Sequence, residues 1–386
     1  QSIGKKGQGS LKRIEHAARP ASAGLRAVNR ASQGAAHGLS GLGRQVPAIE
    51  GLARVLGTTA IVTGLVRIST SSLRAAKDFQ ASMKRVKAAT RATDAQMTQL
   101  EQKARAAGAT TSFRASEAAD AIEMLAKNGL RYQQIVDGAL DSTLTLAAAL
   151  GAELAPAADL TTDLMAQFGL QASDMAEIVD LVTGAALNSK FGFDDLRLAI
   201  GQAGGVAGSF GVEIGDFLTA LAATSSAFSS GQDAGTSFKN FLQRLTPQGA
   251  QARAVMERLG LEFFDTAGNM KSLVEISEEL REAVSGLSEE ARNEALVRIF
   301  GTDAVRTAIL LAERGADGIR EIGAAVREVK AADQAAVRLQ GLEGALKELA
   351  SAWEALQLTA ADEGGLDVAE SAVRRLTDAI RFLNEN

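Results

Sequence analysis

The scarcity of proline is the feature that most constrains what this chain can form. Only four prolines, at positions 20, 47, 156 and 247, occur in 386 residues. Proline breaks a helix interior because it lacks the backbone N–H and its ring clashes with the preceding turn, so long helices are permitted almost everywhere here. Hydrophobic residues make up 46% of the chain and aromatic residues only 4%, which favours helices packed through Ala and Leu over an aromatic-rich sheet core.

Apolar residues recur at helical spacing through most of the chain, so we expect an all-α fold with a multi-helix, bundle-like core. The segment Thr93-Asp-Ala-Gln96 has the form of a capping box and predicts a helix start. Ser116 is the expected cap of the helix that follows. One apolar face of that helix, at positions i, i+3, i+4 and i+7, is formed by Ala118, Ala121, Ile122 and Leu125.

Residues 201–211 hold five glycines, in the sequence GQAGGVAGSFG. The pairs Gly201/Gly205 and Gly204/Gly208 have the small-xxx-small spacing that lets two helix backbones approach closely. A phosphate-binding loop would need G-x-x-x-x-G-K-[ST], or G-x-G-x-x-G after a strand, and neither is present. We therefore expect either close helix packing or a flexible turn here.

Residues 261–274 depart from the helical pattern. Two short apolar runs flank the segment Thr266–Asn269, which predicts a small strand–turn–strand. Asp265 and Asn269 carry oxygen ligands, so the alternative is a calcium loop. The spacing differs from that of calcium loops and the closing glutamate is missing, which favours a plain turn.

Charge is divided unevenly along the chain. Residues 1–92 carry sixteen Lys and Arg against three Asp and Glu, whereas the remainder carries twenty-five against forty-three, giving net charges of +13 and −18. The first part is either a basic arm for an acidic partner or a solvated leader. Without interleaved aromatic residues it supports at most weak, non-specific DNA contact. Its candidate residues for contact with an acidic partner are Lys5, Lys6, Lys12, Arg13 and Arg19.

Within this basic first part, the most apolar segment is 52–68, LARVLGTTAIVTGLVRI. It is short for a membrane-spanning helix and contains Arg54 and Arg67. We expect a helix packed in a bundle, or one that contacts a membrane only transiently. The candidate membrane-contacting residues are Leu56, Ile61, Val62, Leu65 and Val66.

Two heptad patterns occur near the end of the sequence. Leu residues and one Trp alternate at spacings of three and four, and the same spacing recurs over 366–383. These are helical seams for self-association, or the two arms of an antiparallel hairpin within one chain. We expect the pattern to continue in a longer chain. The candidate self-association seam is Leu342, Leu346, Leu349, Trp353 and Leu356.

The residues that usually carry catalysis are scarce. The chain has no cysteine, and its two histidines, His16 and His37, lie in the Gly-rich leader rather than on an expected helix. Pairs such as Asp194/Asp195, Glu278/Glu279 and Glu289/Glu290 fall at expected helix starts or exposed faces, where carboxylates complement the helix dipole. We expect no enzyme activity, and no catalytic, metal or cofactor site.

Several phrases, in their order, resemble the core region of phage tail tape measure proteins of the TP901 type. The resemblance covers about residues 76–358 and depends most on three segments. These are ATTSFRASEAADAIEMLAKNGL (109–130), EFFDTAGNMKSL (262–273) and SAWEAL (351–356).

The resemblance implies a structural protein inside a phage tail tube. It implies a ruler that sets tail length during assembly and leaves through the tail tip ahead of the DNA. The implied partners are further copies of itself as a trimer, the tail tube protein, tail tip or baseplate hub proteins, tail assembly chaperones and, on ejection, the host membrane. The implied locations are the tube lumen in the virion and the host cytoplasm during assembly. The alternatives are a membrane-active, pore-forming helical protein and a helical scaffold unrelated to phages.

We expect three regions: a basic leader over residues 1–70, a helical core over 71–330 and heptad-patterned helices over 331–386. A straight helix rises about 1.5 Å per residue, so the whole chain would span at most about 580 Å. Because glycines interrupt the helices, we expect the core to be a folded helical module rather than an extended measuring rod.

Overall fold

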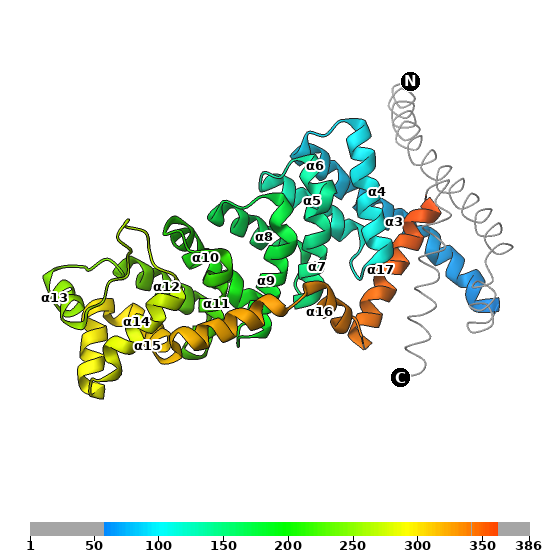
Figure 1. Ribbon diagram of the computed structural model, residues 1–386. Helices are drawn as coiled ribbons and strands as arrows, with labels where there is room; N and C mark the ends of the chain where they lie inside the picture. Colours follow the sequence, from blue (N-terminus) through cyan, green and yellow to red (C-terminus); the bar gives the residue numbers. More distant parts are fainter. Residues whose placement is uncertain (1–57, 341, 362–386) are drawn as a thin grey trace, which may run out of the picture. The chain divides into compact units, whose positions relative to one another are not determined.

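The computed structural model describes residues 58–340 and 342–361, and its elements are helices throughout (Figure 1). The expected all-α class is confirmed. The α-helices are α3 (Thr58–Thr90), α4 (Asp94–Thr110), α5 (Ala115–Lys127), α6 (Tyr132–Gln134), α7 (Leu140–Leu150), α8 (Leu154–Phe168), α9 (Met175–Leu187), α10 (Phe193–Ser209), α11 (Ile214–Thr224), α12 (Gly231–Arg244), α13 (Ala250–Leu259), α14 (Leu273–Ser285), α15 (Glu289–Glu328), α16 (Ala331–Arg338) and α17 (Leu342–Ala361). Short turns η1 (Ile135–Ala139), η2 (Ala172–Asp174) and η3 (Ser225–Ala227) precede α7, precede α9 and follow α11.

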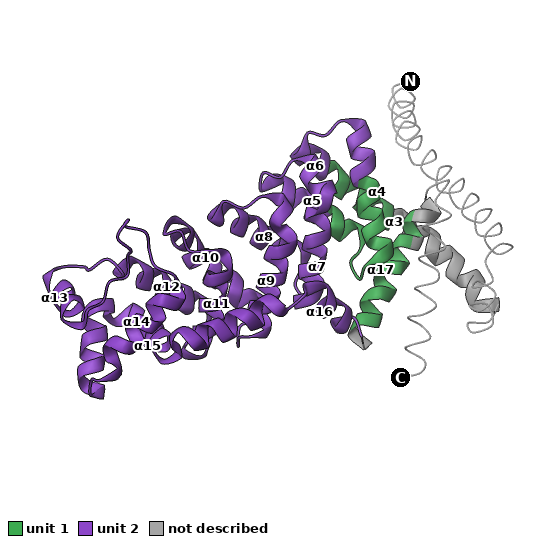
Figure 2. Cartoon of the chain, in the orientation of Figure 1, with its two compact units in different colours: residues 1–84, 101–119, 342–386 green, residues 85–100, 120–341 purple. Residues whose placement is uncertain are grey.

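The chain forms two compact units (Figure 2). Unit 1 comprises residues 1–84, 101–119 and 342–386, and unit 2 comprises residues 85–100 and 120–341. Helix α3 continues without a break across residue 70. The regional divisions expected after residues 70 and 330 remain predictions.

Unit 2 is built from helices stacked in two layers. Helices α8, α10 and α12 pack on one another in series, and α7, α9 and α11 form a second series (Figure 1). Consecutive helices along the chain therefore alternate between the layers. Each pair buries its apolar faces against its neighbours, so the stack forms one continuous core.

The turns that precede the second-layer helices α7, α9 and α11 are alike. They contain Gly129, Gly169 and Gly211, respectively, which recur at nearly equal spacing, with φ of +96°, +67° and +76°. The N–H of the next residue donates back to the carbonyl five residues earlier, for example from Leu170 to Met165 at 2.9 Å. Glycine adopts this left-handed conformation without steric cost, which explains its recurrence where the helix ends.

Side chains after each of these glycines also repeat. Six residues on lies a large apolar side chain that is fully buried: Ile135, Met175 and Phe217. Fourteen residues on, Thr143 and Thr183 are buried and donate their hydroxyls to the carbonyls four residues earlier, each at 2.8 Å. The pairs are thus an internal repeat with the period of these glycines, which helical periodicity alone did not reveal.

Helix α15 runs back across the stack and holds it together. It contacts α12, α11 and α9, and α16 continues on to α9 and α7 (Figure 1). Its direction changes at Gly301 and Gly315, whose φ values are +69° and +58°. The backbone N–H of Ala316, freed by the second break, donates to Glu278 of α14 at 2.8 Å. The two breaks therefore divide α15 into three helical stretches.

Phenylalanine rings form a continuous chain through unit 2. Neighbouring ring centroids lie 5.1–6.2 Å apart, within the range of favourable aromatic contact. The chain joins α8, α11, α12, α15 and the segment before α14. Its members are Phe168, Phe217, Phe238, Phe241, Phe300 and Phe263.

The glycine-rich segment lies within α10 and its close-packing prediction is confirmed for one of the two glycine pairs. A Cβ on Gly204 would lie 1.9 Å from the Gln167 side chain, and one on Gly208 would lie 1.9 Å from the Gln167 carbonyl oxygen. The absence of side chains at these positions lets α10 approach the end of α8. Gly201 and Gly205, by contrast, face open space.

The strand–turn–strand expected near 261–274 is reduced to one antiparallel bridge, between Phe264 and Met270. The turn itself is present, with Gly268 at a φ of +85°. Pairing stops because the next residues start α14: the Ser272 hydroxyl accepts from the Glu275 N–H at 3.2 Å. The apolar runs are too short to form strands before the next helix begins.

The end of α15 lies directly on α9. A Cβ on Gly184 would lie 2.0 Å from the Val326 carbonyl oxygen, a backbone atom that cannot rotate away. Beside this contact, Asp180 accepts from Lys330 Nζ at 2.8 Å and from the Ala331 N–H at 2.9 Å. The Lys330 pKa is raised by its hydrogen bond and charge interaction with Asp180. Helix α9 thus contacts the end of α15 through close backbone packing at Gly184 and through the ion pair between Asp180 and Lys330.

Replacing Gly184 with alanine should therefore destabilise unit 2. The added methyl forces α15 away from α9, and overpacking of this kind typically costs about 1–3 kcal/mol. Urea denaturation followed by far-UV circular dichroism measures the effect.

Gly201→Ala is the matched control, because Gly201 is also helical but its Cβ would meet no atom within 4 Å. Alanine should stabilise that position by up to about 1 kcal/mol through its higher helix propensity. Equal stability of the two variants would show that α15 does not depend on close approach at Gly184.

Candidate functional site

Two neighbouring faces of α17, in unit 1, have different character. Its small side chains are buried, among them Ala345, Ala352 and Ala355. The candidate seam residues Leu346 and Trp353 are 49% and 37% exposed. The helix therefore packs on unit 1 through several small residues and Leu358, and leaves Leu346 and Trp353 accessible.

The remaining seam positions are only partly described. Leu349 is half-buried. Leu342 and Leu356 belong to α17, but their side chains lie outside the described part of the structure. The structure therefore groups Leu346, Leu349 and Trp353 on one side of the helix, at spacings of three and four.

Ser351 attaches α17 to the turn between α4 and α5. Its hydroxyl lies 2.5 Å from the carbonyl oxygen of Gly108, 2.8 Å from that of Thr111 and 3.0 Å from that of Phe113. The last carbonyls of a helix lack partners within the helix, so a buried hydroxyl donor is favourable here. The single hydroxyl proton is shared among three acceptors.

Glu354, one turn further along α17, contacts the start of α5. The residue is only 7% exposed, and its Oε1 accepts from the Ser116 hydroxyl at 2.7 Å. Oε2 is buried without a hydrogen-bond partner among the described residues. Burial raises the pKa of Glu354, against smaller opposing effects of the Ser116 hydrogen bond and the Arg114 charge.

Ser116 is not the helix cap expected from the sequence. Helix α5 begins one residue earlier, at Ala115, and the Arg114 N–H donates to Glu117 Oε2 at 2.8 Å. The Ser116 hydroxyl is directed instead to Glu354. The capping box at Thr93, by contrast, is confirmed: its N–H donates to Gln96 Oε1 at 2.9 Å as α4 begins.

Ser351 and Glu354 together form what we call the polar clasp. It joins two of the three segments on which the sequence resemblance depends, 109–130 and 351–356, although Ser116 and Glu354 are 238 residues apart in the chain. A Cβ on Gly108 would lie 2.7 Å from the Ala115 backbone nitrogen, so the turn that receives the clasp is also tightly folded. Helical periodicity gave no sign of this contact.

The third segment, 262–273, forms a turn closed by hydrogen bonds to Asp265. Asp265 Oδ1 accepts from the N–H groups of Ala267 and Asn269 at 2.9 and 2.8 Å, and Oδ2 accepts from the Asn269 side chain at 3.2 Å. These bonds, led by the Asn269 backbone, lower the pKa of Asp265. Within the described residues, no three His, Cys, Asp or Glu side chains are placed to hold a metal ion.

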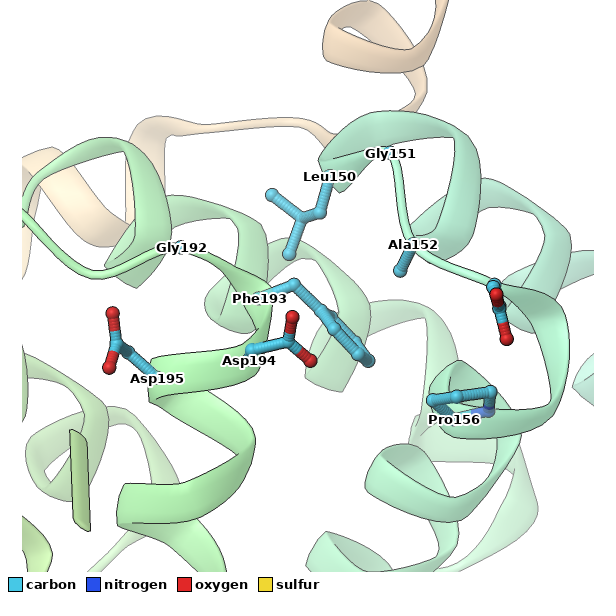
Figure 3. A pocket seen from close by; sticks show the side chains of 9 residues that line it. Leu150, Gly151, Ala152, Pro156, Gly192, Phe193, Asp194 and Asp195 are labelled. Carbon is cyan, nitrogen blue, oxygen red and sulfur yellow. The ribbon is translucent and has the colours of Figure 1, made fainter. Parts of the chain in front are cut away.

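A cavity of about 570 Å³ lies in unit 2, beside the starts of α8 and α10 (Figure 3). One of its carboxylates, Asp195, accepts from the Gly231 N–H at 2.8 Å. Asp194 Oδ1 lies 3.9 Å from Arg197 Nε. Both therefore have structural partners at helix starts. The cavity is lined by Leu150, Gly151, Ala152, Glu153, Pro156, Gly192, Phe193, Asp194 and Asp195.

The other carboxylate pairs considered from the sequence also have structural roles. Glu278 binds Arg281 and accepts from the Ala316 N–H, which together lower its pKa. Glu279 pairs with Lys271. Glu289 and Glu290 occupy the first turn of α15, where negative charge complements the helix dipole.

The other candidate residues cannot be placed at side-chain level. Leu56 and the basic set Lys5, Lys6, Lys12, Arg13 and Arg19 lie outside the described residues. Ile61, Val62, Leu65 and Val66 lie in α3, but only its backbone is described there. In the described part, no single helix is long and apolar enough to cross a membrane. One pair, Tyr132–Leu150 with Leu154–Phe168, meets that test together but is bent by 115°.

Comparison with known proteins places the chain among phage tail proteins. A family model for phage-related minor tail proteins matches residues 101–301. The tape measure protein of Pneumococcus phage Dp-1 is 30% identical over 314 residues, which cover 81% of this chain and 27% of that protein. The probable tape measure protein of Escherichia phage P2 is 28% identical over 290 residues, 73% of this chain and 35% of that protein. No solved structure matches.

The chain thus spans about a quarter to a third of the length of these curated relatives. The resemblance to phage tail tape measure proteins found in the sequence is confirmed. Because the family model covers just over half of its residues, the chain belongs to the family of phage-related minor tail proteins, with tape measure proteins as its relatives.

Proposed function

We propose that this chain is a folded module of a tape measure protein that lies in the tail tube lumen. In this proposal the parent protein sets tail length during assembly, in the host cytoplasm, and is ejected through the tail tip ahead of the DNA. The observation that carries the proposal is the similarity to tape measure proteins over most of the chain. The tail tube protein, tail tip or baseplate hub proteins and tail assembly chaperones are its proposed partners.

The stacked helices support the proposal that other parts of the parent protein determine most of the tail length. Extended as one straight helix, the stretch from 58 to 361 would span about 450 Å, at about 1.5 Å per residue. Packed as alternating pairs, each pair adds only about one interhelix distance, roughly 8–10 Å, to the stack. We propose that this region acts as a compact module attached to an extended ruler.

We also propose that copies associate through the α17 seam, as a trimer. The supporting observation is that Leu346 and Trp353 are accessible while the small residues of the same helix face the fold. Apolar residues at alternating spacings of three and four are the pattern by which helices form coiled coils. Burying one large apolar side chain contributes about 1.5–3 kcal/mol, so a few per copy can hold an oligomer.

Contact with the host membrane on ejection is a further part of the proposal. It is supported by the apolar composition of residues 52–68 alone. The acidic composition of the chain beyond residue 92 supports weak or absent DNA binding, because like charges repel the phosphate backbone.

Phage particles that lack the parent gene should form no tails, or tails of irregular length. The reason is that tube polymerisation would have no internal template to end it. Electron micrographs of particle lysates give the length distribution. Mutant tails as long and as uniform as those of the parent phage would contradict a length-setting role.

The double variant Leu346→Asp, Leu349→Asp should abolish self-association of the purified chain. Charged side chains at the seam cannot be buried between helices without a large desolvation cost. Analytical ultracentrifugation should show a trimer for the original chain and a monomer for the variant.

Val337→Asp is the matched control, because Val337 is 57% exposed on a helix of unit 2 and lies outside the seam. It should leave the oligomer mass unchanged. An unchanged mass for the double variant would remove the seam from the proposal.

A further inference from the structure

The polar clasp contains a buried carboxyl whose hydrogen bonding is incomplete. One oxygen of Glu354 accepts from Ser116 and the other has no partner among the described residues. The nearby Ser351 cannot supply a donor, because its hydroxyl lies among three carbonyl oxygens. An ionised carboxylate in this position is therefore poorly stabilised compared with one in water.

Among the described residues, the charged groups that act most strongly on Glu354 lie at the start of α5. Arg114 favours the ionised form, and Glu117 disfavours it. Glu117 also accepts from the Arg114 N–H, which fixes its carboxylate at the helix start. The two charges oppose each other, so burial remains the largest influence on the carboxyl.

We propose that docking of α17 on the α4–α5 turn is coupled to protonation of Glu354, so that the helix is held firmly in acid and loosens as the pH rises. The neutral carboxyl can still accept from Ser116, and it carries no buried charge. When α17 leaves the turn, the carboxyl becomes hydrated and ionises at its ordinary pKa. The docked state therefore binds one proton more readily than the undocked state.

The direction follows from the raised pKa of the docked carboxyl. Below the ordinary glutamate pKa, about 4.3, the group is protonated in both states and docking is strongest. Between that value and the raised one, the docking equilibrium constant falls by up to tenfold per pH unit, as linkage of a single proton requires. Above the raised pKa the loss is complete and docking no longer changes with pH.

This inference concerns contacts inside one chain and does not depend on the proposed function. Glu354 and the seam residues lie on the same helix, so loosening of α17 would also alter how the seam is presented. Using the full chain with Leu346→Asn and Leu349→Asn changes, which place polar side chains that do not titrate at the seam, removes association through the seam from the measurement. A lack of pH dependence in the protection of α17 can then be told apart from a lack of self-association through the seam.

Amide hydrogen exchange of α17, read by mass spectrometry and corrected for intrinsic exchange rates, tests the proposal between pH 4 and 8. Protection of α17 should fall as the pH rises and then level off. Emission from Trp353, the only tryptophan in the chain, provides a second readout beside Glu354. Glu354→Gln, which cannot ionise, should remove the pH dependence of both signals. In the control variant Glu117→Gln, the protection of α17 should still decrease as the pH rises.

A Glu354→Gln protein with the same fall in protection as the original chain would overturn the proposal, as would protection in the original chain that is constant or rises with pH. Should Glu354→Gln fail to fold by circular dichroism, Ser116→Ala decides. Ser116→Ala removes a hydrogen bond that favours the ionised form of Glu354. It should therefore raise the pH at which the protection of α17 stops decreasing. An unchanged or lower value would overturn the proposal as well.

Discussion

The fold of unit 2 depends on the contacts that α15 makes with helices of both layers. Helix pairs in series touch only their neighbours, so such a stack has few contacts between residues distant in sequence. Helix α15 supplies them by crossing α12, α11 and α9 in turn. At one end Phe300 joins the chain of phenylalanine rings, and at the other Val326 rests on the bare backbone of Gly184. These contacts tie separate helix pairs into a single core.

Much of this fold could be predicted from local sequence. The scarcity of proline and the three-and-four spacing of apolar residues gave the helical class, and Thr93 with Gln96 gave a correct helix start. Gly204 and Gly208 gave a correct close contact, although its partner, Gln167, could not be named. Local rules succeed where the interacting groups lie within one or two turns of each other.

The features that local rules missed depend on distant residues or on comparison between segments. Ser116 looked like a cap, but its partner is Glu354 on another helix. The two short apolar runs near Asp265 looked like strands, yet α14 starts before they can pair. The repeat had a readable signal: a glycine followed by Leu or Val at positions 129, 169 and 211. Aligning the chain with itself, so that the first of these glycines falls on the second, would have shown it.

The seam could be predicted only as a pattern. Its spacing was compatible with pairing between chains or within one, and the structure adds that Leu346 and Trp353 are accessible on α17. The residues that attach α17 to the rest of unit 1 include small and polar side chains. Ala352 and Ser351 have no strong pattern in sequence, so periodicity could not assign them.

The crossing helix has a consequence for how this module can change in evolution. Duplicating the stretch of gene that encodes one repeat would add a helix pair whose turn and buried positions already match its neighbours. The enlarged stack would nevertheless outgrow α15, whose reach is set by its own length and by its two bends at Gly301 and Gly315. Lineages that gain or lose a pair must therefore lengthen or shorten this helix in step, which makes the number of pairs resistant to single mutational events.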